Sequence, residues 1–391
     1  MTFVKAVLRV MRRELKLFAG FRTFSTLSVG LPLVALLYFV VLIDKGVPED
    51  MPVAVVDRDN TELSRQLTRM IDATPAARVA YHLSDMQEGE KLMREGKIDA
   101  IVDIPRDLEK DVFGNKQANV VAYINGTNVT KNGILDRDIR TTLYTFSSGI
   151  EIQLLVKKGI SEKEAYDMMM PIYYEKHILF NPYTNYAYYL LPIFLPMMLL
   201  IFTLLTTIFT IGTELRNATA PYWLAAGNGN IFAAFLGKVL PYTFIFTILS
   251  IFIDVLMFKI IGVPMRGHKG MLLASDLLFV MAYQSIGVFI ITLVGNMRLG
   301  LSVGGGYSVL AFTFSGMTFP LIAMYPAVQA ASRIFPLTYY MELFIDQAMR
   351  GAPAGQSVDD LLYIAVFILL PLPLLHRLKR LCSDAKYWGK L

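Results

Sequence analysis

Two acidic residues and one amide lie inside long apolar stretches of the chain, where they are the first candidates for a functional site. Asp254 lies within the stretch 236–261, and Asp276 and Gln284 lie within 272–296. An ionisable group in an apolar membrane segment is costly, so it lines a pathway or pairs with a partner. Helical rise places Asp254 about 27 Å from the start of its stretch, toward the outer side. We expect Asp254 either to line a pathway or to pair within the protein, and Asp276, near a span end, to be hydrated.

Motifs for nucleotide binding or hydrolysis are missing from the sequence. Its glycine–lysine pairs, at 96–97, 237–238 and 389–390, are not followed by Ser or Thr, so none completes a phosphate-binding loop. There is no HExxH and no cysteine–histidine cluster. We therefore expect no catalytic residue, no metal and no cofactor bound by this chain.

The composition predicts a membrane protein. Of 391 residues, 54% are hydrophobic and only 18% are charged, against about 25% charged in soluble domains. The single cysteine, Cys382, excludes an intrachain disulfide. The net charge of +5 is small, and no nucleic-acid partner is expected.

Residues 1–23 predict a basic amphipathic helix on the cytoplasmic side. Apolar residues recur at helical spacing on one face, and this helix carries Arg9, Arg12, Arg13 and Lys16. Such a helix is typical of the membrane interface. The alternative is a helix packed on a soluble domain. We do not expect this segment to be a cleavable signal peptide, because its charged stretch is long and no small-residue cleavage site follows the first apolar run.

Six apolar stretches predict membrane spans, most of them with the roughly 20 residues needed to cross. They are 24–43, 187–211, 236–261, 272–296, 299–322 and 359–375. Prolines 371 and 373 are expected to end the sixth. Both chain ends, including the tail 376–391, are rich in Lys and Arg. The positive-inside rule therefore predicts both termini in the cytoplasm.

The segment 44–186 predicts a folded extracytoplasmic domain. Strand patterns at 52–59, 77–83, 97–105 and 119–126 alternate with helical patterns, and 132–158 reads as one long helix. This alternation is typical of a small α/β unit with a mainly parallel sheet. The fold class is therefore a mainly α membrane protein of six transmembrane helices, with an N-terminal interfacial helix and an α/β external domain.

Three stretches resemble the permeases of ATP-binding-cassette (ABC) exporters of type 2. SGMTFPLIAMYPAVQAASRIFPLTYYMELF (315–344) is similar to the family's G-x-x-F/Y-P, P and P-x-T/S-Y pattern after the fifth span. GKIDAIVDIPRDLEKDVFGNKQANVVAYINGTN (96–128) and HILFNPYTNYAYYLLP (177–192) resemble a subgroup with a large external domain, which typically works with a periplasmic adaptor. IGTELRNATAPYWLAAGNGN (211–230) resembles the loop between the second and third spans.

The resemblance implies that residues 316–350 form a re-entrant hairpin at the external end of the pathway. Broken backbone at membrane depth is tolerated where protein or a cavity covers it, and prolines end short helices. The alternative is a plain extracellular loop. The gate residues that the resemblance implies are Gly316, Phe319, Pro320, Pro336 and Tyr339.

The resemblance also implies that residues 212–235, between spans in the segment 187–375, form the loop that couples to the ATPase. Its implied coupling residues are Glu214, Arg216, Thr219, Tyr222 and Trp223. Glu214 stands where the family usually has its first acid. Arg216 replaces the second acid, and Ala218 replaces the usual glycine before Thr219. The two aromatic residues fill an ATPase groove or anchor the loop in the membrane interface.

Gly300 and Gly304 form a GxxxG pattern that allows helices to approach closely. The sequence leaves open whether this contact is a dimer seam or lies within one chain.

Together these features predict one permease half of a bacterial inner-membrane exporter or efflux pump with an unknown substrate. A separate ATPase subunit would hold ATP and Mg²⁺, and a second permease copy or a sibling permease would complete the pathway. A periplasmic adaptor and membrane lipids are further expected partners. The alternative is a non-transporting receptor or envelope-assembly factor whose external domain binds a ligand. A secondary transporter is less favoured, because no internal repeat is evident.

Overall fold

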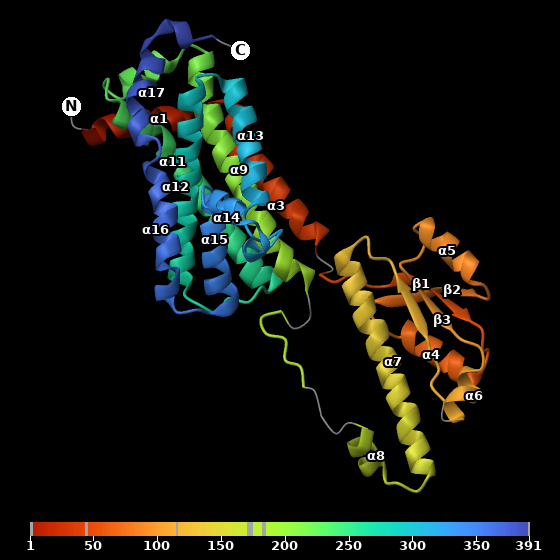
Figure 1. Ribbon diagram of the computed structural model, residues 1–391. Helices are drawn as coiled ribbons and strands as arrows, with labels where there is room; N and C mark the ends of the chain where they lie inside the picture. Colours follow the sequence, from red (N-terminus) through yellow and green to blue (C-terminus); the bar gives the residue numbers. More distant parts are fainter. Residues whose placement is uncertain (1–2, 44–45, 115, 170–174, 182–184, 390–391) are drawn as a thin grey trace. The chain divides into compact units, whose positions relative to one another are not determined.

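The computed structural model describes residues 3–43, 46–114, 116–169, 175–181 and 185–389. The chain forms two compact units (Figure 1), one of Met1–Gly46 with Ile178–Leu391 and one of Val47–His177. The predicted external domain spans residues 44–186. Near its two ends, residues 44–45 and 182–184 lie outside the described residues. Tyr186, predicted to end that domain, begins a helix of the other unit.

The unit Val47–His177 is built on a four-stranded sheet with the order β2-β1-β3-β4. The central strand β1 (Met51–Asp57) runs parallel to β2 (Ala77–Leu83) and to β3 (Ala100–Ile104), and β4 (Val121–Ile124) is antiparallel to β3. The prediction of a mainly parallel sheet is confirmed. Its helices are α4 (Glu62–Asp72), α5 (Met86–Arg94), α6 (Leu108–Phe113), α7 (Val129–Lys157) and α8 (Glu162–Met169).

Helices cover both faces of this sheet because β1 is apolar on both. Side chains alternate across a strand, so Val53 and Val55 share one face with residues of α4 and α7. Ala54 and Val56 point to the opposite face and pack near α5. Two separate apolar clusters result, as expected for a strand that is buried on both sides.

The other unit is a bundle of long apolar helices. Among the residues that the structure describes, five helical segments are long and apolar enough to cross a membrane: Arg22–Leu42, Tyr186–Arg216, Ile231–Ile261, Lys269–Val294 and Ala354–Ser383. The predicted fifth span corresponds to α13 (Met297–Thr313), which has 17 residues and ends well before the predicted end at 322. It packs along α9 (Tyr186–Arg216).

Several spans consist of more than one helical element, and shorter helices complete the bundle. The first span comprises α2 (Arg22–Ser25), a π-helical turn and α3 (Leu31–Leu42). The third comprises α11 (Ile231–Val255) and a π-helical turn Leu256–Ile261, and α12 (Lys269–Val294) is the fourth. The others are α1 (Phe3–Gly20), α10 (Ala220–Ala226), α14 (Pro326–Ser332), α15 (Pro336–Phe344), α16 (Val358–Val366) and α17 (Leu375–Ser383).

The expectation that prolines 371 and 373 end the last span is wrong. The helical path continues from α16 through short 3₁₀ turns at Phe367–Leu369 and Leu372–Leu374 into α17. Pro371 precedes the turn Leu372–Leu374 and Pro373 stands in its first positions. A backbone N–H has no intrahelical partner there, so the missing N–H of proline does not interrupt the helical path. The candidate span is consequently 30 residues long.

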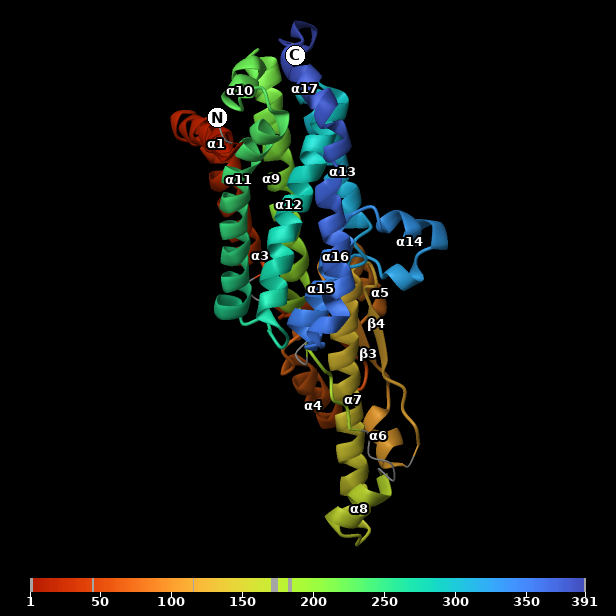
Figure 2. The ribbon, with the colours of Figure 1, turned by 90° about the vertical axis from the view of Figure 1, so that its left-hand side faces the viewer.

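The predicted hairpin 316–350 divides into two parts with different surroundings. Figure 2 shows α14 projecting from the side of the bundle, partway along its length. Exposed apolar side chains lie in or beside this projection, with Ile322 91% and Tyr325 83% exposed. By contrast, α15 is buried and packs against α12 and α16. Only the part before Pro336 is therefore a projecting hairpin.

Candidate functional site

Close packing of α1 against α11 creates the framework of the candidate site. A Cβ atom built on Gly237 would lie 2.6 Å from the Cβ of Val10 and 2.6 Å from the backbone oxygen of Val7. No larger side chain fits at position 237 without moving one helix. Because α1 and α11 touch here, the residues next to this contact, Glu14 and Lys238, are brought together.

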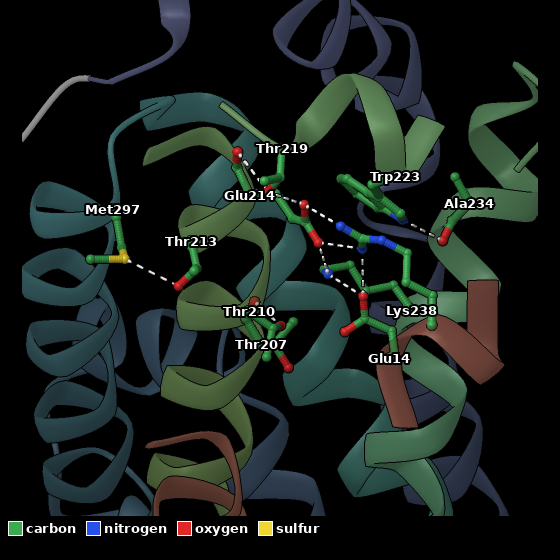
Figure 3. Close-up of polar contacts among 11 residues, drawn as sticks. Glu14, Thr207, Thr210, Thr213, Glu214, Thr219, Trp223, Ala234, Lys238 and Met297 are labelled. Carbon is green, nitrogen blue, oxygen red and sulfur yellow. Dashed lines mark hydrogen bonds and ion pairs between the residues drawn. The ribbon is translucent and has the colours of Figure 1, made fainter. Parts of the chain in front are cut away.

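A cluster of four charged residues joins α1, α9 and α11 (Figure 3); we call it the ion cluster. It consists of Arg13, Glu14, Glu214 and Lys238. Lys238 Nζ lies 2.6 Å from Glu14 Oε1 and 2.9 Å from Glu214 Oε1. Arg13 donates two hydrogen bonds to Glu214, of 2.5 and 2.9 Å, and a third of 3.1 Å to Glu14. Two positive and two negative groups thus balance.

The ion cluster is buried, so its charges depend on one another. The side chains of Glu14, Lys238 and Glu214 are 0%, 1% and 4% exposed. Burial opposes the charge on Arg13, but the hydrogen bonds and charges of Glu214 and Glu14 together outweigh that effect and raise the pKa of Arg13 above its ordinary value. Removing one member of such a cluster leaves an uncompensated buried charge, which costs about 3–5 kcal/mol.

Glu214 also connects the ion cluster to α10. The hydroxyl of Thr219, the residue before α10, donates a 2.5 Å hydrogen bond to Glu214 Oε2, and the Thr219 backbone N–H donates to the Glu214 carbonyl at 2.9 Å. The N-cap of α10 is therefore attached to the same carboxylate that binds Arg13 and Lys238. A displacement of α10 must change the surroundings of Glu214.

The two aromatic residues of α10 have opposite surroundings. Trp223 is fully buried, and its indole N–H donates to the carbonyl of Ala234 in α11 at 3.0 Å. Its ring lies 5.1 Å from Lys238 Nζ, within cation–π range. Tyr222 is 72% exposed. Trp223 therefore anchors α10 inside the protein, in neither of the two expected roles, and Tyr222 alone remains available to a partner or a membrane surface.

The turn before α10 shows why the family has glycine at the position that Ala218 occupies in this chain. Ala218 has a φ of +56°, in the left-handed region, which glycine adopts without the steric penalty of a Cβ. The family resemblance places glycine at this position.

Arg216 is exposed and does not reach the ion cluster; its side chain makes a long 3.5 Å contact with the neighbouring Asn217 instead.

Sequence reasoning finds half of the ion cluster. It predicts Glu214 and Arg13, but for separate roles, and it misses Glu14 and Lys238. Two signals are present: Glu14 is the only acid in the basic segment 1–23, and Lys238 is the only basic residue in α11. One isolated acid in one segment and one isolated base in another suggest that the two pair. Glu14 and Lys238 are 224 residues apart in the sequence, however, so no local pattern shows this pairing.

Helix α1 places its basic residues apart from its buried stripe. Arg9, Arg12 and Lys16 face outward, whereas Ala6, Val10 and Glu14 are buried. The apolar residues Val4, Leu8 and Leu15 of this helix are also exposed. The helix thus has a protein-facing stripe that the sequence does not predict, beside an exposed apolar surface.

Asp254 and Asp276 lie together in the interior, and the expectation that Asp276 is hydrated is wrong. Asp276 is 0% exposed and accepts a 2.8 Å hydrogen bond from the hydroxyl of Tyr340 in α15. Asp254 is 9% exposed and its carboxyl contacts that of Asp276. This contact supports the pairing alternative for Asp254.

The glycines of the GxxxG pattern face α9 within the same chain. A Cβ on Gly304 would lie 2.5 Å from Ile208 Cδ1, and one on Gly300 would lie 3.1 Å from Ile208 Cγ2. This placement supports the internal contact. The next two glycines, Gly305 and Gly306, have nothing within 4 Å of a built Cβ, so the opposite face of α13 remains open.

The predicted gate residues are distributed over both parts of the hairpin region. Gly316 has a φ of +86°, and a Cβ there would lie 2.7 Å from Leu321, so the turn after α13 requires glycine. Phe319 is 52% exposed, and Pro320 is exposed beside it. Pro336 begins α15 at a position where proline is favoured. Tyr339 is buried, with its ring centroid 5.0 Å from that of Tyr363.

Comparison with known proteins places this architecture in a family. The family model described as ABC-2 family transporter protein matches residues 21–375, which covers most of the chain. No curated protein matches the sequence. The match includes both ends of the loop that contains α10, and it favours a transporter over a receptor or envelope-assembly factor.

Proposed function

This chain belongs to the ABC-2 transporter family, and from that premise we propose that it is the permease subunit of an ABC exporter. It would move a substrate out of the cytoplasm or the inner membrane, driven by a separate ATPase subunit that holds ATP and Mg²⁺. The observation that carries the proposal is the ion cluster, which connects α10 to α1 and to two spanning helices.

In this proposal α10 is the element that meets the ATPase. Tyr222 is its exposed contact residue, and Trp223 is the internal anchor that transmits a push to α11. Glu214 acts through Thr219 as a positioning residue, because it is buried and has no surface to offer a partner. Arg216, exposed at the end of α9, is available for a charged contact beside Tyr222.

The proposed orientation puts α1, α10 and α17 on the cytoplasmic side of a bacterial inner membrane. Basic residues concentrate in α1 and α17, as the positive-inside rule requires. Arg377 donates hydrogen bonds to the backbone carbonyls of Thr292 and Leu293 at the end of α12. The unit Val47–His177 would then be extracytoplasmic, where a periplasmic adaptor is its proposed partner.

A second permease subunit, identical or a sibling, would complete the pathway. The first span is only 17% buried in its most apolar part, and Gly305 and Gly306 leave the outer face of α13 open. Small residues permit close approach of another helix. The projecting hairpin before Pro336 would close the external end of this shared pathway.

The test is affinity purification of the tagged chain from native membranes in mild detergent with an ATP analogue, followed by mass spectrometry. The proposal predicts an ATPase subunit in near-equal amount, and it predicts that Trp223→Ala, which removes the anchor of α10, reduces this recovery. The matched control is Phe244→Ala, which truncates an aromatic residue of α11 that is 69% exposed and should leave recovery unchanged. A chain that purifies alone under these conditions would contradict the proposal.

A further inference from the structure

A pocket of about 360 Å³ opens between the ends of α11 and α12 that lie away from α10. Its volume falls within the range of about 300–1,000 Å³ that is typical of ligand sites. Three kinds of residue line it: the acid Asp254, the bases Lys259 and Lys269, and a larger set of apolar side chains. This combination is unlike the uniformly apolar surface that a spanning helix presents to lipid tails.

Asp254 lines this pocket, and no basic side chain is paired with it among the described residues. Its side chain is nine-tenths buried, and its carboxyl contacts the carboxyl of Asp276. Asp276 receives the Tyr340 hydroxyl on one oxygen, and its second oxygen, Oδ2, has no partner within the described chain. Two carboxyl groups in contact do not both stay ionised, and no cation among the described residues contacts this pair, so an entering ammonium would find acceptor oxygens there.

Two lysines, Lys259 and Lys269, also line the pocket. Lys259 is five residues beyond Asp254, which is about 7 Å along a helix, and Lys269 begins α12. Both are exposed, and neither has an ion pair in the described part of the chain. The pocket therefore combines two exposed lysines with one nearly buried acid.

The apolar wall of the pocket is open to the membrane. Ile251, Val255 and Leu273 line it and are 43%, 46% and 45% exposed. A ligand held here would keep its apolar part against these side chains and continue into the lipid.

From these features we infer that the pocket binds the headgroup of an aminophospholipid, a glycerophospholipid with a primary ammonium such as phosphatidylethanolamine. The ammonium would donate to Asp254, the phosphate would meet Lys259 and Lys269, and the acyl chains would lie along the apolar wall. A cationic amphiphile without phosphate would be repelled by the lysines. A lipid without an ammonium would leave Asp254 unpaired, and a trimethylated ammonium has no N–H to donate.

The inference is tested by native mass spectrometry of the full-length, delipidated chain with three lipids of identical acyl chains. These are phosphatidylethanolamine, phosphatidylcholine and phosphatidylglycerol. We expect phosphatidylethanolamine to bind about 10-fold more tightly than either of the others, the ratio that one charge-assisted hydrogen bond supplies. Asp254→Asn should reduce its affinity to that of phosphatidylcholine. The double variant Lys259→Gln/Lys269→Gln should weaken all three lipids.

The matched control is Asp359→Asn, an exposed acid at the start of α16 that does not line the pocket. It should leave the lipid preference unchanged. If Asp254→Asn does not fold, Leu273→Trp, which fills the pocket from its exposed wall, should cause the same loss. Equal affinity for the three lipids, or a preference that survives both Asp254→Asn and Leu273→Trp, would overturn the inference. Equal or tighter binding of phosphatidylglycerol would show that only phosphate is recognised and would also overturn it.

Discussion

Replacing Lys238 with methionine tests whether the ion cluster holds together the end of the bundle that carries α1 and α10. Methionine keeps the length and apolar stem of the side chain but removes its charge. The change leaves Glu14 and Glu214, two buried carboxylates, against the single positive charge of Arg13. The cluster then carries a net negative charge in a site that excludes water.

The expected cost follows from the contact distances. At 2.9 Å and an effective dielectric constant of about 20, one ion pair is attractive by about 6 kcal/mol. Part of that attraction only offsets the desolvation of the charges. Breaking a buried pair by removing one partner typically costs about 3–5 kcal/mol. We expect Lys238→Met to lower the free energy of unfolding by this amount.

The assay is equilibrium unfolding of the purified chain in mixed detergent micelles, followed by tryptophan fluorescence. Trp223 lies 5.1 Å from the lysine and reports on this region. Lys379→Met, an exposed lysine in α17, is the control and should change stability by less than about 0.5 kcal/mol. Adding Glu14→Gln to Lys238→Met restores the charge balance and should recover most of the loss. A stable single variant, or a double variant no better than the single, would refute the reasoning.

Three further predictions concern the elements around the ion cluster. Ala218→Gly should raise the free energy of unfolding by about 1 kcal/mol, because it relieves a left-handed backbone position; an equal or lower stability in the same assay would contradict this. Gly237→Leu should lower it by about 1–3 kcal/mol by forcing α1 away from α11, whereas Gly305→Leu, on an open face, should have little effect on the isolated chain. Tyr222→Ala should leave stability within about 0.5 kcal/mol yet reduce ATPase co-purification; unchanged recovery would remove Tyr222 from the interface.

Features with a local or periodic signal are predictable from the sequence. Runs of about 20 apolar residues locate the spanning helices because the membrane thickness sets their length. Alternation of strands and helices identifies the sheet of the unit Val47–His177, since β1 is followed by α4 and β2 by α5. The third strand and the antiparallel β4 also lie within the predicted strand segments.

Features that depend on contacts between distant segments are not predictable in this way. Glu14 and Lys238 pair only because Gly237 allows α1 to approach α11. Asp276 is expected to be hydrated because it lies near the start of its helix, but it is buried and accepts a hydrogen bond from Tyr340 of α15. Trp223 resembles a surface anchor because α10 is short and lies between spans, yet the Ala234 carbonyl offers its indole a buried acceptor. In each case a partner in another helix decides the environment.

Photo-crosslinking from position 222 shows whether α10 contacts the ATPase. A photoreactive phenylalanine analogue replaces Tyr222 in the full-length chain in native membranes, and mass spectrometry identifies the crosslinked protein. The same analogue at Phe244, which is 69% exposed on α11, is the control. We expect a crosslink to a nucleotide-binding ATPase subunit from position 222 and none from position 244. Absence of the ATPase at 222, or its equal capture at 244, would contradict the claim that α10 is the coupling element.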